Sequence, residues 1–172
     1  SAAGKTIMTT EPKFIPNQAV TIQIEDGLDV NVRLVDSVGY AVDGAKGFED
    51  ENGPRMIHTP WYEDPIPFHD AAEIGTRKVI QEHSTIGIVV TTDGTIGEIP
   101  RADFVEAETK VINELKEVGK PFIVIVNSVR PTDQETELLR QHLAEEHDVP
   151  VLCMSVETMN EHDVYNVLRE SL

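Results

Sequence analysis

The second half of the chain alternates between short apolar runs and longer amphipathic segments, and this rhythm limits the possible folds more than any other feature. The apolar runs are rich in Ile and Val, as buried parallel strands are, and cover residues 85–91, 122–126 and 151–154. Each run is followed by a helix-start signal, in order Asp103, Thr132-x-x-Glu135 and Thr158-x-x-Glu161. Repeated strand–helix units predict an α/β fold with a mostly parallel sheet covered by helices on both faces.

The first half contains a predicted antiparallel hairpin. Apolar and polar residues alternate over residues 19–24 and again over 30–35, and the Asp26-Gly27 step between them is a strong turn signal. Residues 40–68 are rich in Gly and Pro, so we expect an irregular loop there. Residues 70–83 have the spacing of a modestly amphipathic helix.

Composition excludes several classes of function. The 172 residues carry a formal net charge of −17, whereas nucleic-acid binding requires clustered Lys and Arg, so we expect no nucleic-acid partner. The same charge disfavours direct attachment to an anionic membrane. Most of it is expected to be solvated surface, with an acidic face that docks a basic partner as the alternative. The single cysteine, Cys153, lies in an apolar run and is expected to pack as a small hydrophobic residue.

Two of the predicted strands end in turns that carry a carboxylate or a carboxamide. The second strand of the hairpin runs into Asp36-Ser37-Val38-Gly39, and the strand over residues 122–126 runs into Asn127. P-loop NTPases hold Mg²⁺ through the Asp of an Asp-x-x-Gly turn and contact the γ-phosphate with the Gly backbone N–H. A later strand that ends in Asn grips the nucleotide base in the same fold. The pattern therefore predicts nucleotide hydrolysis, with an ordinary strand-terminal turn as the alternative for Asp36.

The loop that should hold the phosphates is not found in the chain. Gly4-Lys5-Thr6 has the ending of a Walker A loop, but the Gly expected five residues earlier is absent. Pro12 and Pro16 block the helix whose N-terminus should meet the phosphate. We interpret this segment as a connecting loop, so the first strand and the phosphate loop are expected to be missing.

Long stretches of the chain resemble one protein family in particular. They include residues 4–14, 33–36, 44–47, 49–57, 59–62, 71–87, 91–97 and 118–122. Over essentially its whole length the chain resembles the stage IV sporulation protein A family, within the translation-factor-related GTPase class of P-loop NTPases. The resemblance implies a three-layer sandwich with a mostly parallel sheet and an antiparallel hairpin strand.

The family resemblance also implies that residues 1–172 form a single partial NTPase domain with several segments. The expected segments are a switch I-like segment at residues 1–18 and a hairpin at residues 19–35. A switch II-like insertion is expected at residues 36–69, and a helix followed by βα repeats at residues 70–172. If the central strand is missing, the strands at 30–35 and 85–91 should pair with each other or be covered, with residues 7–10 as the candidate filler.

Site roles follow from the resemblance residue by residue. Thr9 and Thr10 match paired switch I threonines that sense the γ-phosphate, although the residues alone favour a simple β-forming pair. Asp36 matches the Walker B carboxylate that holds Mg²⁺, and Gly39 the amide that contacts the γ-phosphate. Ser155 occupies the place of the loop that flanks the base.

The base-reading motif departs from that of GTPases. GTPases of this class carry Asn-Lys-x-Asp, whose Asp accepts two hydrogen bonds from guanine, whereas this chain has Asn127-Ser128-Val129-Arg130. Since a cation at Arg130 cannot accept those bonds, guanine specificity is not expected. Adenine agrees with the family, so Mg²⁺ with ATP is the predicted cofactor and substrate pair.

The resemblance implies an ATP-hydrolysing scaffold that self-assembles into the basement layer of the bacterial spore coat. Its implied partners are further copies of itself, other spore coat proteins and a small membrane-associated amphipathic peptide. Its implied location is the mother-cell cytoplasm, at the outer forespore membrane. We expect the isolated 172-residue chain to be inactive. The alternatives are a nucleotide-independent polymerisation module and a regulatory nucleotide switch.

Overall fold

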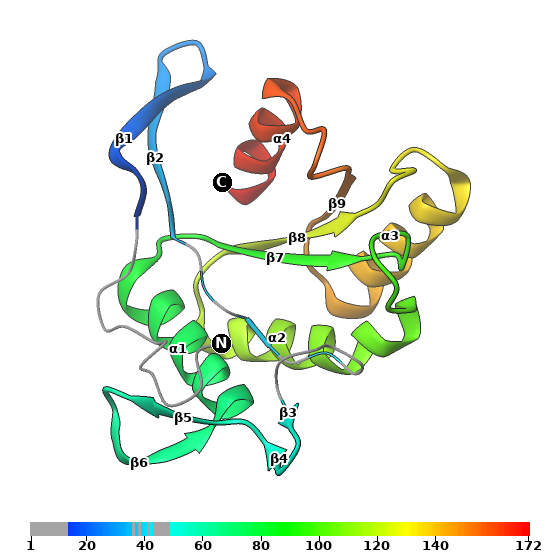
Figure 1. Ribbon diagram of the computed structural model, residues 1–172. Helices are drawn as coiled ribbons and strands as arrows, with labels where there is room; N and C mark the ends of the chain where they lie inside the picture. The colour runs from blue at the N-terminus through cyan, green and yellow to red at the C-terminus, as the bar shows by residue number, and fades with distance from the viewer. Residues whose placement is uncertain (1–13, 36, 38, 41, 43–48) are drawn as a thin grey trace. The chain divides into compact units, whose positions relative to one another are not determined.

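The computed structural model describes residues 14–35, 37, 39–40, 42 and 49–172 of the chain (Figure 1). The predicted site residues Thr9, Thr10 and Asp36 lie outside these ranges. The chain divides into two compact units, one formed by Ser1–Gln23 with Gly27–Ser84 and the other by Ile24–Asp26 with Thr85–Leu172.

The second unit contains the parallel sheet that the strand–helix rhythm predicts. Its strands lie in the order β7-β8-β9, with β7 and β8 parallel and β8 and β9 parallel. The strands are β7 (Gly87–Thr92), β8 (Phe122–Asn127) and β9 (Val151–Met154), and the helices are η1 (Arg101–Phe104), α2 (Val105–Val118), α3 (Gln134–His147) and α4 (Glu161–Ser171). The chain is thus a mixed α/β protein with a mostly parallel sheet, as expected.

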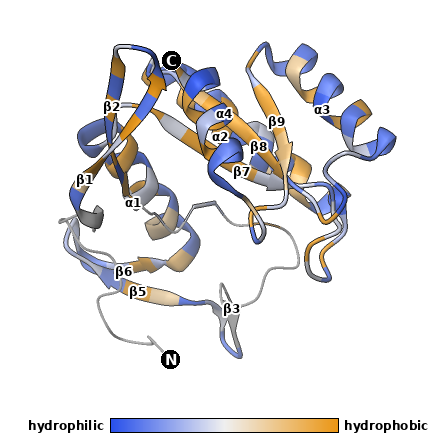
Figure 2. Ribbon diagram, turned by 90° about the horizontal axis from the view of Figure 1, so that it is seen from above, coloured by the Kyte–Doolittle hydropathy of each residue, from blue (hydrophilic) through white to orange (hydrophobic). Residues whose placement is uncertain are grey.

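Both faces of this sheet are covered. Figure 1 shows α4 on one face and α2 on the other, and Figure 2 shows the strands between them as the hydrophobic part of the unit. Ile123 and Ile125 of β8 pack with Val167 of α4. On the other face Val124 and Val126 are fully buried, in keeping with the alternation of side chains along a strand. This burial explains why β8 is apolar at every position before Asn127.

The helix ends differ from the predicted caps. Asp103 lies inside the 3-10 turn η1, and α2 begins only at Val105. α3 begins at Gln134, directly after its N-cap Asp133, so Thr132 precedes the cap position and forms no capping box. α4 does have a capping box, but Asn160 and Asp163 form it instead of Thr158 and Glu161. The predicted helices exist, but the three assigned caps were wrong.

The described part of the chain begins with the predicted hairpin. β1 (Phe14–Glu25) pairs with β2 (Leu28–Val35) across the Asp26-Gly27 turn, where Gly27 has a left-handed φ of 82°. A side-chain hydrogen bond links the two strands, since Thr21 Oγ1 donates to Asn31 Oδ1 at 2.7 Å. β1 extends several residues further towards the N-terminus than the alternation predicted.

Residues 49–67 form two small hairpins where an irregular loop was expected. The strands are β3 (Glu49–Asp50), β4 (Gly53–Pro54), β5 (Met56–Thr59) and β6 (Tyr62–Pro67). Both pairs are antiparallel, and each belongs to a separate two-stranded sheet. Every strand of a two-stranded sheet has a free edge, where the missing N–H of proline costs little. The prolines therefore did not exclude strands here.

α1 (Phe68–His83) packs against the second of these hairpins. Ile57, Ala71 and Ala72 are fully buried, with Trp61 and Ile66 packed around them. The two alanines allow the hairpin to approach the helix closely.

The prediction that a central strand is missing can be compared with the structure only in part. Among the described residues β7 pairs with β8 alone and β2 with β1 alone, so the two strands at 30–35 and 85–91 do not pair with each other. The candidate filler at residues 7–10 lies outside the described ranges.

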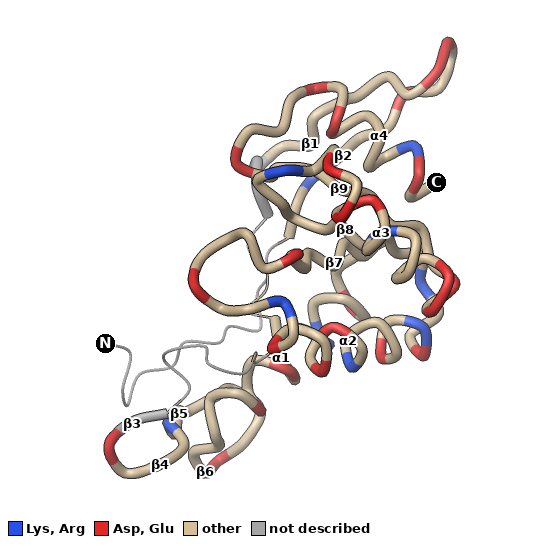
Figure 3. Tube along the Cα trace, turned by 90° about the vertical axis from the view of Figure 1, so that its right-hand side faces the viewer, with Lys and Arg blue, Asp and Glu red and all other residues tan. Residues whose placement is uncertain are grey.

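Within the described ranges no helix is both long enough and apolar enough to cross a bilayer. Figure 3 shows acidic residues on hairpins, helices and loops of both units, consistent with a solvated acidic surface.

Candidate functional site

The candidate site lies at the carboxyl edge of the parallel sheet, where the loops after β7, β8 and β9 meet. Asn127, the last residue of β8, accepts a hydrogen bond through Oδ1 from the backbone N–H of Val156 at 3.0 Å. The next residue, Ser128, donates its N–H to the carbonyl of Met154 at 3.0 Å. These bonds hold the loop that carries Ser155 against the end of β8. The structure therefore brings the predicted base-side residues Asn127 and Ser155 into adjoining loops.

A carboxylate at the end of β7 connects the loops after β7 and β8. Asp93 Oδ1 accepts from the backbone N–H of Thr95 at 3.0 Å and from its Oγ1 at 2.5 Å. Oδ2 accepts from Ser128 Oγ at 2.6 Å and from Thr136 Oγ1 at 3.4 Å. Ser128 is fully buried, so its hydroxyl needs such a partner.

The hydrogen bonds of Asp93 keep it ionised. Burial alone raises the pKa of this carboxyl, but the bonds from Ser128, Thr95 and Thr136 together outweigh burial and place the pKa below its ordinary value. An ionised carboxylate only accepts hydrogen bonds, so the hydroxyl groups of Thr95 and Ser128 donate to it. Thr136 has a single hydroxyl hydrogen, which it shares between the Arg130 carbonyl at 2.9 Å and Asp93 at 3.4 Å.

The hydroxyl groups held by Asp93 in turn order the backbone after Asn127. Thr95 Oγ1 accepts from the N–H of Val129, and Ser128 Oγ accepts from the N–H of Arg130, both at 3.0 Å. The Arg130 carbonyl accepts from Thr136 Oγ1 at 2.9 Å. The Arg130 guanidinium pairs with Asp133 at 3.2 Å in an exposed position. Residues 128–130 are thus held by side chains of three different segments.

A buried ion pair anchors η1 and α2 at the end of β7. Glu108 on α2 has a nearly fully buried side chain, and its Oε1 accepts from Arg101 Nη2 at 2.8 Å. Arg101 Nη1 also contacts Glu108 Oε2, and it donates to the carbonyl of Thr92 at 3.2 Å. Thr91 Oγ1 donates to the same carboxylate at 2.5 Å. η1 and α2 are therefore tied to the end of β7.

Gly94 is required where this loop leaves β7. Its φ is +88°, and a Cβ there would lie 2.7 Å from the backbone nitrogen of Arg101. Gly97, in the same loop, has a φ of +72° and would place its Cβ more than 4 Å from any described atom. Both glycines have the left-handed conformation, but only at Gly94 would a Cβ clash with a neighbouring atom.

We expect Gly94→Ala to lower the free energy of unfolding by about 2–4 kcal/mol, because strain and overpacking add. The matched control Gly97→Ala should cost only about 1 kcal/mol, from strain alone. Urea unfolding of both variants measures the difference. Equal losses would show that the approach of Arg101 to Gly94 is not a tight one.

Gly39 lies in the first unit. It has a left-handed φ of 85°, and its N–H donates to Thr76 Oγ1 of α1 at 2.9 Å. Thr76 is buried and donates to the carbonyl of Ala72 at 2.7 Å. The amide predicted to contact a γ-phosphate is therefore hydrogen-bonded within its own unit in this structure. The catalytic roles of Thr9, Thr10 and Asp36 stay predictions.

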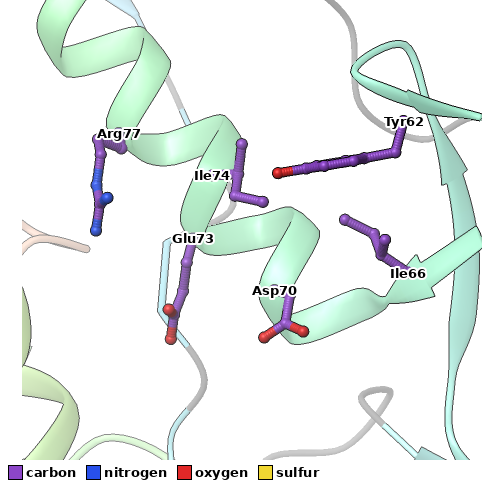
Figure 4. Close-up of a pocket in the computed structure, with 6 residues that line it drawn as sticks. All are labelled: Tyr62, Ile66, Asp70, Glu73, Ile74 and Arg77. Carbon is purple, nitrogen blue, oxygen red and sulfur yellow. The ribbon is translucent and has the colours of Figure 1, made fainter.

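The first unit also contains an open cavity of about 340 Å³ between β6 and α1 (Figure 4). Its lining residues are Tyr62, Ile66, Asp70, Glu73, Ile74 and Arg77. In Figure 4 Tyr62 and Ile66 of the hairpin lie opposite the helix that carries Ile74. No predicted site residue lines this cavity.

Other candidate groups can be placed among the described residues. In those ranges no three His, Cys, Asp or Glu side chains gather closely enough to hold a metal ion, and the predicted Mg²⁺ ligand Asp36 lies outside them. Burial, followed by the nearby charge of Glu137, raises the pKa of Cys153 to about 11. Its Sγ lies 3.7 Å from the carbonyl of Thr136. Cys153 is therefore a half-buried side chain that stays in the thiol form at neutral pH, in keeping with its apolar run.

Parallel strand–helix units with a polar carboxyl edge define an α/β domain of the class that binds ligands beyond its strand ends. The family model "Stage IV sporulation protein A, ATPase domain" matches residues 1–172. The chain belongs to this family.

Curated relatives named "Stage IV sporulation protein A" match the whole chain. Those of Bacillus anthracis and Bacillus subtilis (strain 168) are each 74% identical over 172 residues, and that of Clostridioides difficile (strain 630) is 50% identical. In each case the match covers 100% of this chain and 35% of the relative, so the chain spans about a third of their length. No solved structure matches.

Proposed function

We propose that the protein that carries this domain hydrolyses ATP with Mg²⁺, and that turnover drives its self-assembly into the foundation layer of the spore coat. The observation that carries the proposal is the match of the family's ATPase domain to all 172 residues. The placement of Asn127 and Ser155 in adjoining loops at the carboxyl edge supports a base-binding role for that edge. The proposed fold class is the P-loop NTPase class related to translation factors.

In the proposed mechanism the protein contributes positioning and electrostatic stabilisation and does little covalent chemistry. Asp36 would hold the Mg²⁺ ion, which neutralises charge that develops on the phosphate oxygens. Thr9 and Thr10 would contact the γ-phosphate side of the nucleotide. Gly39 would offer its N–H to the γ-phosphate once the bond to Thr76 is exchanged for it. The bond at 2.9 Å between neutral groups is weaker than one to an anion, which favours the exchange.

The proposed partners are further copies of the protein, other spore coat proteins and a small membrane-associated amphipathic peptide. The proposed location is the mother-cell cytoplasm at the outer forespore membrane. A formal net charge of −17 favours docking of basic partners over direct adsorption to anionic lipid.

Nucleotide competition in the full-length protein tests the proposal. We expect Mg²⁺-dependent ATP hydrolysis that unlabelled ATP inhibits about tenfold more strongly than GTP, because Asn127-Ser128-Val129-Arg130 lacks the acceptor for guanine. Tenfold corresponds to about 1.4 kcal/mol, which one hydrogen bond supplies. Inhibition by GTP equal to that by ATP would contradict the adenine assignment, and absence of hydrolysis would contradict the ATPase.

A further inference from the structure

Six backbone N–H groups around the carboxyl edge donate inward, to other groups of the protein. The N–H of Gly94 donates to Thr92 Oγ1, that of Thr95 to Asp93 Oδ1, and that of Ser128 to the Met154 carbonyl. The N–H of Val129 donates to Thr95 Oγ1, that of Arg130 to Ser128 Oγ, and that of Val156 to Asn127 Oδ1. A donor used inside the protein cannot be offered to a ligand without losing its bond.

The internal use of these N–H groups affects which purine base the edge can bind. Adenine carries a 6-amino group, which donates a hydrogen bond, whereas hypoxanthine and guanine carry a 6-oxo group, which accepts one. These six amides leave no donor of their own for a 6-oxo group, whereas a carbonyl oxygen that already accepts one bond keeps a second lone pair for a 6-amino group. The edge therefore suits a 6-amino purine.

We propose that Asp93 and Thr95 are positioning residues that determine base selectivity, by keeping the Val129 and Arg130 amides turned away from the nucleotide. This rests on the proposed ATP site. The Asp93 carboxylate takes the hydroxyl hydrogens of Thr95 and Ser128. Only lone pairs then remain on those oxygens, and they accept from the two amides. The negative charge at the end of β7 thus sets the donor pattern of the loop after β8.

Thr95 is the residue of this arrangement whose hydroxyl group can be removed with least damage to the fold. Its bond with the Val129 amide lies in an exposed position, and the Val129 side chain is 53% exposed. Loss of the Thr95 hydroxyl leaves that amide without its acceptor near the ligand edge. A freed N–H is a donor that a 6-oxo purine can use.

The test compares Thr95→Val, which keeps the side-chain volume and removes the hydroxyl, with the matched control Thr95→Ser, which keeps the hydroxyl. ATP and ITP are the probes, because ITP carries 6-oxo in place of 6-amino. In the full-length protein we expect Thr95→Val to lower the ATP-to-ITP ratio of kcat/KM at least about fivefold, the typical effect of one hydrogen bond. The change should lie in KM, with kcat within about twofold. Thr95→Ser should keep the wild-type ratio.

A second readout does not depend on nucleotide. Hydrogen exchange of a peptide over residues 127–131 reports the Val129 and Arg130 amides together with that of Ser128, since Pro131 has none. Exchange should accelerate at least about fivefold in Thr95→Val and stay unchanged in Thr95→Ser. Asp93→Asn keeps the shape and loses the charge, and it should shift the ATP-to-ITP ratio in the same direction.

The outcomes separate this inference from the proposed function. If wild type prefers ATP but Thr95→Val keeps the same ratio and the same exchange rate, the inference is wrong and the ATP site stands. An equal loss of kcat with both nucleotides would show a merely structural role and overturn it. If wild type hydrolyses neither nucleotide, the proposed function itself fails.

Discussion

Replacing Arg101 with alanine is expected to lower the free energy of unfolding by about 3–5 kcal/mol. The change leaves the Glu108 carboxylate almost fully buried and without its cation, while the Thr91 hydroxyl still donates a hydrogen bond to it. An uncompensated buried charge is among the most costly defects in a protein interior. Denaturant unfolding with linear extrapolation measures the loss, which should also lower Tm by roughly 2–4 °C per kcal/mol.

Two controls show whether the burial of the pair is the cause. Arg140→Ala removes an ion pair with Glu137 that is more exposed, at 29% and 48% of the side chains, and should cost about 1 kcal/mol or less. The double variant Arg101→Met with Glu108→Leu replaces both charges by apolar groups and should recover most of the loss. If Arg101→Ala costs no more than Arg140→Ala, the buried pair does not hold the loop to β7.

The parallel sheet could be predicted because its signal is local and repeated. Residues 122–126 are apolar at every position, which suits a strand covered on both faces, and α4 and α2 do cover it. Gly119 is a typical helix-terminating residue, and it ends α2 with a left-handed φ of 79° and its N–H bonded to the Leu115 carbonyl. Both features depend on residues next to one another in sequence.

The hairpins over residues 49–67 could not be predicted from their composition. Pro65 and Pro67 are unfavourable in a central strand, and only the observed pairing shows that β6 lies in a sheet of two strands. The misplaced caps have a similar origin. Asn160 and Thr158 are both good cap residues, and their identities alone do not distinguish two helix starts that lie two residues apart.

The candidate site was predicted where one residue ends a strand and missed where several segments cooperate. Asn127 was found because it follows an apolar run directly. The position of Asp93 at the carboxyl end of a strand follows from the sequence, but its bonds to Ser128 and Thr136 do not, since these partners are distant in sequence. A carboxylate directly after a buried strand was the available signal. Arg101 and Glu108 gave no local signal because their pairing depends on how η1 meets α2.

The second large effect is expected for Asp36→Ala in the full-length protein, where ATP hydrolysis should fall at least about 100-fold. If Asp36 holds the Mg²⁺ ion, its loss removes several kcal/mol of transition-state stabilisation, and each 1.36 kcal/mol is about a factor of ten in rate. Steady-state ATPase assays at saturating Mg²⁺ measure the change. Asp29→Ala, which removes an exposed carboxylate of β2, is the matched control and should keep wild-type turnover.

Assembly measured on the same samples decides between the functions that the resemblance leaves open. Loss of both turnover and polymer in Asp36→Ala, with both kept in Asp29→Ala, supports a scaffold whose assembly depends on hydrolysis. Polymer formation without turnover would instead support a structural module in which nucleotide chemistry is incidental. Normal turnover in Asp36→Ala would refute its role as the metal ligand. The turn after β2 would then be an ordinary strand end, and the Mg²⁺ ligand would have to come from another segment, since a loose phosphoryl transition state still requires a cation at its oxygens.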